Sequence, residues 1–451
     1  MASQPSGRNM TVGSPAGHIL AVSLPLLAGS FLQQFYNLVD SWVVGNFVSD
    51  AALAAVGMGF PVMTLFQALF IGLSTGGTVI IAQYYGAGKG EAVKNAVDTI
   101  YTAFVRSVIP VTAIALLLLR PMLRLLRVDE SAWHETWVYL AVVTVGLVGT
   151  IGYNFNAGIL NGLGNSRTTL IFLAVAAVMN IVLDLVFVLV FQMGVFGVAL
   201  ATIIAQAFSW LFGIFYINRR YPEIAIHPFN GHLDRKLLRQ IINIGLPSGL
   251  QMSLVSIAVM AVTSKVNSFG TEVWGAGFNV GNKLDSMAFL PVQCLCSAAT
   301  AFVWQNMGAG KPDRAARGTW VTVGLSAVWT AVCNLILLKW GHVFAGLFTP
   351  EAAVVESTSV YLDWVLPPSI LFTSFYVLNA AMRGAGDSLF PMVNTIASML
   401  LVRLPALYFL ANAYGPEYMY WGYAVGWIAG CALSVGYFCT GKWKKKGSLA
   451  K

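Results

Sequence analysis

The sequence predicts an all-α integral membrane protein with twelve transmembrane helices. Hydrophobic residues make up 57% of the chain and charged residues only 10%, whereas charged residues make up about a quarter of a typical soluble domain. The mean hydropathy is +0.72, and repeated apolar runs reach the roughly 20 residues that a helix needs to cross a bilayer. Because these runs are continuous rather than alternating, helices are favoured over a β-barrel.

The apolar runs form two groups of six, one on each side of a polar connection. We therefore predict an N-lobe of helices one to six at 18–217, a cytoplasmic linker at 218–240 and a C-lobe of helices seven to twelve at 241–440. A cytoplasmic N-terminal tail is expected at 1–17 and a basic cytoplasmic tail at 441–451. The expected helices lie at about 18–44, 51–82, 95–119, 133–156, 168–191, 195–217, 241–266, 272–304, 318–339, 355–379, 388–411 and 419–440.

Lysine and arginine predict the orientation, because the cytoplasmic loops of membrane proteins are enriched in them. If the N-terminus is inside, most loop cations fall on the cytoplasmic side, including those of the linker and of the tail GKWKKKGSLAK. Both termini are therefore predicted to be cytoplasmic, and the net charge of +8 is explained by loops beside a membrane rather than by a nucleic-acid partner. The outer side then holds mainly Arg120, Arg124, Arg127, Lys265 and Lys339.

Two short motifs are similar to known sites but lack their spacing. Cys294 and Cys296 are too close together for half of a zinc site and have no partner histidines, and no disulfide framework is expected. GAGKG at 86–90 lacks the spacing of a phosphate-binding loop and is predicted to be a tight turn after a membrane helix. Since we find no ATP-binding sequence, we expect no cofactor and no enzyme activity; energy would come from an ion gradient or a partner.

The two halves are copies of one another. YYGAGKGEAV at 84–93 matches NMGAGKPDRA at 306–315, and LNGLGNSR at 160–167 matches MRGAGDSL at 382–389, both at an offset of 222 residues. Several matches at one offset indicate an internal duplication. Each copy holds six spans, an even number, so the copies start on the same side of the membrane as a parallel repeat. Two such lobes predict a secondary transporter that works by alternating access.

The repeat separates scaffold residues from site residues. Pro25 recurs as Pro247, and both prolines are predicted to bend the first helix of their lobe. A polar cluster in the first lobe, in contrast, has apolar counterparts 222 positions later. Its members are Asp40, Asn180, Asp184, Thr202 and Tyr36, and the counterparts are Val262, Val402, Ala406, Ala424 and Ala258.

The depth of these residues predicts a site for a coupling cation. At 1.5 Å per residue, Asp40, Asp184 and Thr202 all lie roughly 8–12 Å below the outer surface. Asn180 is one turn from Asp184 on the same helix face. Carboxylate, amide and hydroxyl oxygens together suit a proton or a small hard cation such as sodium, the one metal expected here. The alternative is that the two acids are solvated vestibule groups or helix caps.

Other intramembrane polar residues allow more than one interpretation. In the second lobe, Asp363 is expected to form a structural ion pair with Arg403 or Lys283, although these groups and Asp285 could instead act in substrate binding or gating. Tyr139 recurs in the repeat and could equally be a packing residue. The residues expected to face a substrate cavity are Gln33, Gln34, Asn37, Tyr139, Asn154, Asn156, Gln206 and Gln251.

Four of these stretches together resemble the multidrug and toxin extrusion (MATE) family over essentially the whole chain. They are QQFYNLVDSWVVG at 33–45, the GAGKG turn, NGLGNSR with RGAGDS, and NIVLDLVF at 180–187. The sequence looks most similar to the DinF-like prokaryotic branch. The resemblance implies a multi-pass protein of a prokaryotic inner membrane that exports cationic or amphipathic drugs or toxins in exchange for protons or sodium. It also implies a cation site at Asp40, Asn180, Asp184 and Thr202, with Tyr36 beside it and Pro25 as the bending proline.

The chain departs from the family pattern in two places. Many relatives have a proline after the helix-five aspartate, where this chain has Leu185, and residues 242–266 hold no acid, so a NorM-type sodium site in the second lobe is not expected. The implied partners are a small cationic or amphipathic substrate and membrane lipid, with the protein as a monomer. The alternative functions are a lipid-linked precursor flippase of the same superfamily and, in a different class, a channel or a non-transporting receptor.

Overall fold

The computed structural model describes residues 9–48, 50–125, 130–228, 232–269 and 272–446. Side chains are excepted at 37–38, 40–42, 45–46, 50–62, 64–66, 69, 125, 130–132, 267, 272 and 446. Across the described ranges nearly every residue is helical and none belongs to a β-strand. The predicted all-α membrane fold is therefore confirmed.

Twelve helical passes follow one another along the chain. Nine helices among the searched residues are long and apolar enough to cross a membrane, and two bent pairs bring the number to eleven. The pairs are Trp133–Val145 with Leu147–Gly162, bent by 47°, and Ala352–Val365 with Ser369–Gly384, bent by 59°. Helix α2 (Asp50–Gly86), part of which lies outside the described side chains, completes the twelve.

The two bends were not visible in the hydropathy of the fourth and tenth runs. The second bend coincides with Pro367 and Pro368, which cannot donate the hydrogen bonds that continue a helix. The first lies at Gly146, where an added Cβ atom would stand only 1.9 Å from the side chain of Ile203. The bend thus lets two helices approach closely where a side chain would not fit.

The chain divides into two compact units. Unit 1 comprises Met1–Asn9 and Leu24–Gly249, and unit 2 comprises Met10–Ser23 and Leu250–Lys451. Two of the three boundaries inside the chain therefore cut through a continuous helix, α1 (Pro15–Phe47) and α8 (Arg235–Asn267). Pro25 and Pro247 each lie within three residues of a boundary, so the two repeated prolines mark the points at which helices pass from one unit to the other.

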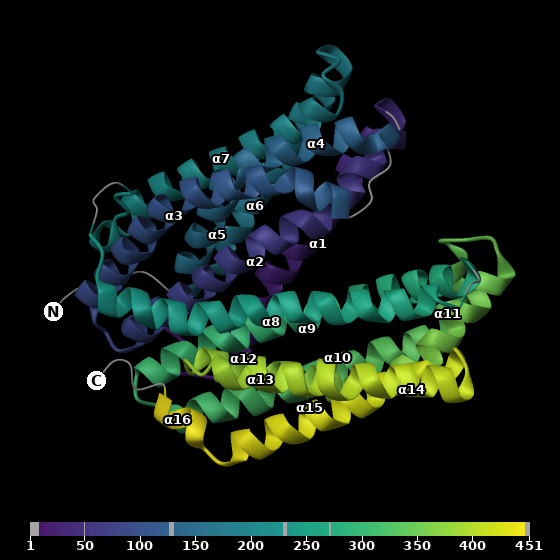
Figure 1. The fold of residues 1–451 in the computed structure, drawn as a ribbon. Coiled ribbons are helices and arrows are strands. Elements are labelled where there is room, and N and C mark those ends of the chain that lie inside the picture. Colours follow the sequence, from purple (N-terminus) through teal and green to yellow (C-terminus); the bar gives the residue numbers. More distant parts are fainter. Residues whose placement is uncertain (1–8, 49, 126–129, 229–231, 270–271, 447–451) are drawn as a thin grey trace. The chain divides into compact units, whose positions relative to one another are not determined.

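Unit 1 is a bundle in which α2 packs on both helices of the first bent pair (Figure 1). The last complete membrane helix of the unit, Gly194–Arg220, packs on Leu147–Gly162 and on Ser166–Leu185. Val43 and Val44 of α1 form an apolar cluster with Val188, Val195 and Val198, which holds the end of α1 beside the site described below. The further elements of unit 1 are α3 (Gly90–Leu125), α4 (Glu130–Val145), α5 (Leu147–Gly162), α6 (Ser166–Leu185), the π-helical η1 (Val186–Val190), α7 (Gly194–Arg220) and η2 (Pro222–Ile224).

Unit 2 repeats this packing scheme within itself. The helix Glu272–Gly308 packs on both helices of the second bent pair. The second helix of that pair, Ser369–Gly384, also packs on the last membrane helix, Trp421–Cys439. The elements are α9 (Glu272–Gly308), α10 (Pro312–Gly346), α11 (Ala352–Val365), α12 (Ser369–Gly384), α13 (Leu389–Thr395), the π-helical η3 (Ile396–Arg403), α14 (Leu404–Tyr414), η4 (Glu417–Tyr420), α15 (Trp421–Cys439) and α16 (Lys442–Lys446).

The repeat extends to the geometry of the turns. Gly88 and its counterpart Gly310 both have φ of 70°, and Gly164 and Gly386 have φ of 77° and 88°. After Gly88 the amide of Lys89 donates to the carbonyl of Tyr84 at 3.0 Å, the helix-ending bond that favours a glycine with positive φ. The GAGKG stretch is thus a tight helix-ending turn, as predicted, and not a phosphate loop.

Glycines bring α2 and the first half of α8 into close backbone contact within unit 1. Gly72 and Gly76 are spaced as a GxxxG pair, and so are Gly245 and Gly249 on α8. A Cβ atom on Gly76 would stand 2.3 Å from the carbonyl oxygen of Ile241, and one on Gly72 would stand 2.4 Å from that of Gly245. Since both atoms belong to backbone, the helices cannot keep this spacing if either glycine gains a side chain.

We expect Gly76→Ala to lower the melting temperature of the purified protein by a few degrees, because overpacking costs about 1–3 kcal/mol. Gly324→Ala is the matched control, since Gly324 is also interior to a long helix but a Cβ atom there meets nothing within 4 Å. Thermal unfolding of both variants in the same detergent measures the difference. Equal melting temperatures would show that the α2–α8 crossing is not tight.

Candidate functional site

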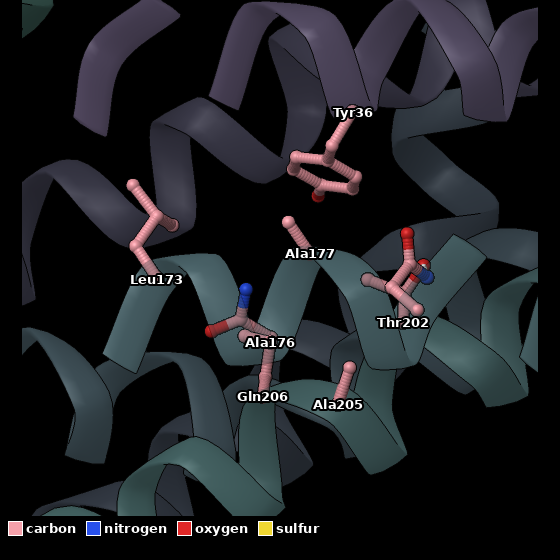
Figure 2. Close-up of a pocket in the computed structure, with 8 residues that line it drawn as sticks. Tyr36, Leu173, Ala176, Ala177, Thr202, Ala205 and Gln206 are labelled. Carbon is pink, nitrogen blue, oxygen red and sulfur yellow. Dashed lines mark hydrogen bonds between the residues drawn. The ribbon is translucent and has the colours of Figure 1, made fainter. Parts of the chain in front are cut away.

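Three of the residues predicted for the cation site surround one small cavity in unit 1. The cavity has a volume of about 10 Å³ and is lined by Tyr36 of α1, Asn180 of α6 and Thr202 of α7, among others. That is about the space of a single water molecule. Figure 2 shows Tyr36, Thr202 and Gln206 reaching from two helices toward the same space.

A hydrogen bond joins the two helices at this point. The Nδ2 atom of Asn180 donates to Oγ1 of Thr202 at 3.4 Å, and that hydroxyl donates to the carbonyl of Val198 at 3.1 Å. The Oδ1 atom of Asn180 is buried and has no hydrogen-bond partner among the described residues. The same is true of Oε1 of Gln206, one turn along α7 from Thr202. The cavity therefore has two electron-rich oxygens available to a cation or a water molecule.

Asp184 lies one turn beyond Asn180 on α6 and is 0% exposed to solvent. A carboxylate at this depth carries a high desolvation cost unless a proton, a cation or a hydrogen-bond donor compensates its charge. Helix α6 ends at Leu185 and continues directly as the π-helical η1, so the backbone is irregular immediately after the acid despite the missing proline. Single π-helical turns occur frequently at functional sites.

The remaining predicted members of the site lie on α1. Asp40 and Asn37 lie on α1, but their side chains are outside the described set. Gln33 and Gln34 are exposed in their own unit, whereas Tyr36 is half-buried at the cavity. The structure thus brings together Tyr36, Asn180 and Thr202, places Asp184 one turn away, and adds Gln206, which the sequence assigned only to a general substrate cavity.

Other residues predicted to face a substrate cavity have internal contacts. Asn156 is fully buried, accepts a hydrogen bond from the Tyr101 hydroxyl and donates to the carbonyl of Trp210 at 2.8 Å. The side-chain amide of Asn154 donates to the carbonyl oxygen of Thr150 in the same helix at 2.8 Å. Tyr139 packs against the valine cluster that holds the end of α1. These contacts favour roles in helix packing, which no single-residue signal in the sequence distinguished from a cavity role.

In unit 2, Gln251 connects three helices. It donates from Nε2 to Oγ1 of Thr395 at 2.8 Å, and its Oε1 accepts from the Arg383 guanidinium, also at 2.8 Å. With an exposed fraction of 7%, Gln251 is an interior group of this unit rather than a lining residue. Arg383 belongs to the repeated RGAGDS motif, so the motif was a signal for this contact that the sequence analysis did not use.

The expected ion pair of unit 2 is absent. Among the described residues, neither Arg403 nor Lys283 comes within 4.0 Å of a carboxylate oxygen of Asp363, and Asp363 is exposed. Arg403 is instead 5% exposed, and its guanidinium carbon lies 3.6 Å above the ring of Tyr423. Arg403 also interacts electrostatically with Asp285. Stacking on Tyr423 and this interaction stabilise the desolvated guanidinium without Asp363, which explains why the pairing of Asp363 was wrong.

Comparison with known proteins identifies a family. The family model MatE matches residues 25–186 and 247–409, two blocks whose starts are separated by the offset of the internal repeat. The chain is 28% identical to "Probable multidrug resistance protein YpnP" of Bacillus subtilis over 97% of both proteins. It is 26% identical to "FAD transporter" of Shewanella oneidensis, over 88% of this chain and 89% of that protein.

Solved structures show the same fold. A multidrug resistance MATE family transporter in an outward-facing conformation matches with a TM-score of 0.90 at 23% identity, over 98% of this chain and 100% of that one. A MOP superfamily transporter from Pyrococcus furiosus, described as having a binding pocket of reversed polarity, matches with a TM-score of 0.91 at 22% identity over 100% of both chains. At these identities the likeness concerns the fold alone.

If the cavity of unit 1 binds a cation, that cation must raise the melting temperature, since a ligand that binds the folded state stabilises it by about 2.7 kcal/mol at 100 times its Kd. We expect the melting temperature of the wild type to change with sodium or with pH, and Asp184→Asn to lose this dependence. Thermal unfolding across a series of sodium concentrations and pH values measures it. Asp363→Asn, at an exposed acid of unit 2, should retain the dependence; full retention in Asp184→Asn would contradict the assignment.

Proposed function

The chain belongs to the MatE family of membrane transporters, and we propose that it is a secondary antiporter that exports cationic or amphipathic drugs or toxins in exchange for protons or sodium. It is a multi-pass membrane protein and not an enzyme. The names of relatives such as YpnP support drugs as cargo. The distribution of lysine and arginine supports cytoplasmic N-terminal and C-terminal tails, and the bacterial relatives support the cell membrane of a prokaryote. We also propose that the protein acts as a monomer.

The observation that carries this proposal is the asymmetry between the units. Tyr36, Asn180 and Thr202 share a cavity in unit 1. In unit 2 the counterpart of Tyr36 is Ala258, fully buried in an apolar cluster, and the counterpart of Thr202 is Ala424, 4% exposed. A scaffold needs the same residues in both copies, but a coupling site needs only one. The polar cluster is therefore best explained by a ligand of unit 1, and its oxygen donors favour sodium or a proton.

The mechanism follows from where the site lies on the continuous helices. Tyr36 and the predicted ligand Asp40 are on α1, which crosses from unit 2 into unit 1 next to Pro25. A cation that draws α1 toward α6 and α7 would favour one conformation of this helix. A ligand shifts a conformational equilibrium only by its difference in affinity for the two states. Cation binding and release at this site would therefore drive the alternation between outward- and inward-facing forms, with Pro25 and Pro247 as hinges.

The cargo remains a separate question from the coupling ion. One relative is named as an FAD transporter, so an anionic nucleotide is a second candidate beside a cationic drug. The buried Arg403 of unit 2 is a cation that such a cargo could approach, whereas the buried Asp184 of unit 1 favours a cationic drug. Transport in proteoliposomes that contain either a fluorescent organic cation or FAD distinguishes the two cargoes, because only the true cargo should move when a pH or sodium gradient is applied.

Proteoliposome transport tests the proposal directly. We expect the wild type to move a fluorescent cation when a pH step or a sodium step is applied, and Asp40→Asn and Asp184→Asn to lose gradient-driven transport by at least about 100-fold, because the coupling charge is gone. Both variants should still insert into the membrane, which their yield and gel-filtration profile would show.

Asp363→Asn serves as the matched control and should transport like the wild type, since its side chain is exposed and distant in sequence from the cluster. The proposal fails if Asp184→Asn transports normally under both gradients. Net cargo flux without any dependence on a cation gradient would favour a channel instead.

A further inference from the structure

Unit 1 contains a second, larger cavity that the proposed transport cycle does not use. Its volume is about 310 Å³, at the lower end of the roughly 300–1,000 Å³ of ligand pockets. Its walls come from α2, α3 and α5 and from the stretch between Leu233 and Ile242 that begins α8. Aliphatic and aromatic side chains such as Leu73, Phe104 and Phe155 form nearly all of the lining, and Arg106 and Ser107 are its polar members. A ligand that fits must therefore be mostly apolar with a polar end.

The lining of the cavity includes Leu233, next to the linker residue Asp234 at the polar end of α3 and α8. The amide of Asp234, at the end of the linker, donates to Oγ1 of Thr99 on α3 at 3.2 Å. Arg106 is two turns further along α3, about 10 Å at 1.5 Å per residue. Helical side chains lean toward the N-terminus of their helix, so Arg106 leans back toward the linker. Each polar layer of a bilayer is about 5–8 Å thick, so an Arg106 side chain that leans back from about 10 Å would reach that layer if Thr99 lies at its aqueous edge.

The charges around the cavity favour an anion. Two nearby acids are already used: Asp98 pairs with Lys94 at 2.5 Å, and Asp234 accepts from the amide of Lys236 at 2.7 Å as the cap of α8. The first turns of α8 carry Arg235, Lys236 and Arg239, which are exposed and form no ion pair within the described ranges.

The position of these basic residues is unfavourable for the helix itself. The N-terminus of a helix carries a partial positive charge, so basic side chains there are destabilising, whereas an anion there is stabilising. In this chain the basic turn adjoins an apolar cavity whose one charged lining residue is a further arginine. An amphiphile with a negatively charged head compensates the positive charge of the first turns of α8 and fills the cavity at the same time.

We propose that the cavity binds one acyl chain of an anionic phospholipid, with the phosphate held by Arg106 and the basic start of α8. The chain lies among the apolar side chains of α2, α3 and α5, and the headgroup stays at the level of the linker. Because Leu238, Ile241 and Ile242 of α8 form part of the wall, the lipid joins the first half of α8 to the rest of unit 1. This site is independent of the cation cavity and of the identity of the cargo.

Native mass spectrometry of the full-length protein tests this inference with two lipids of identical acyl chains, phosphatidylglycerol and phosphatidylcholine. We expect the first bound lipid to be preferentially phosphatidylglycerol in the wild type. Arg106→Gln should reduce this preference about five-fold, the effect of one basic residue at a lipid surface. Ala103→Phe, which fills the cavity, should weaken the binding of both lipids.

Arg124→Gln is the matched control, since Arg124 is exposed on the same helix but does not line the cavity, and it should keep the preference of the wild type. Because Arg106 is exposed, its replacement is not expected to impair folding, so the result does not depend on the stability of Ala103→Phe. An unchanged preference in Arg106→Gln, or wild-type binding of both lipids by a folded Ala103→Phe protein, would overturn the proposal.

Discussion

The hydrogen bond between Asn180 and Thr202, with the carboxylate of Asp184 one turn away, places polar groups in the apolar interior of unit 1. The rest of the structure must compensate these groups. A charge with 0% exposure among membrane helices needs a proton, an opposite charge or a hydrogen-bond donor beside it. Asn180 and Gln206 also leave two oxygens without partners among the described residues. Helix packing does not require these polar groups, since the counterparts of Asn180, Asp184, Thr202 and Gln206 in unit 2 are valine, alanine, alanine and isoleucine. The two oxygens of Asn180 and Gln206 that lack partners among the described residues, beside a buried acid, are thus the physical reason to expect a cation at this point of the chain.

The repeat shows how such a site can exist on a duplicated scaffold. Both copies keep the same helix-ending turns, with Gly88 and Gly310 at the same φ of 70°, and both keep a proline near a unit boundary. The GxxxG pairs of α2 and α8 fix one close crossing by backbone contact. What differs is the chemistry on the helices: an acid with amides in unit 1, and in unit 2 an arginine that stacks on Tyr423 and interacts electrostatically with Asp285. Duplication therefore conserves geometry while the two interiors diverge in charge.

Much of the fold could be read from the sequence, because continuous hydrophobicity, glycine turns and an exact repeat offset are local patterns. The cluster of Tyr36, Asn180 and Thr202 was also predictable, since the missing counterparts in the second copy separated it from the scaffold. The bend at Gly146 was not, because it depends on which helix lies opposite. The bend at Pro367 and Pro368 had a local signal in the two prolines, which hydropathy does not register. For the same reason the sequence could not show that Asn156 bonds Tyr101 and Trp210, or that Arg403 stacks on an aromatic ring rather than pairing with Asp363.

The central claim is that only unit 1 couples transport to a cation. Its most direct test is the number of cations bound per chain, measured by equilibrium binding of radioactive sodium and by the protons released into weakly buffered solution when the cargo binds. The account predicts a single coupled cation per chain, sodium or proton, and none in Asp184→Asn. Two equivalents per chain, or one that persists in Asp184→Asn, would place a coupling site elsewhere and contradict the account.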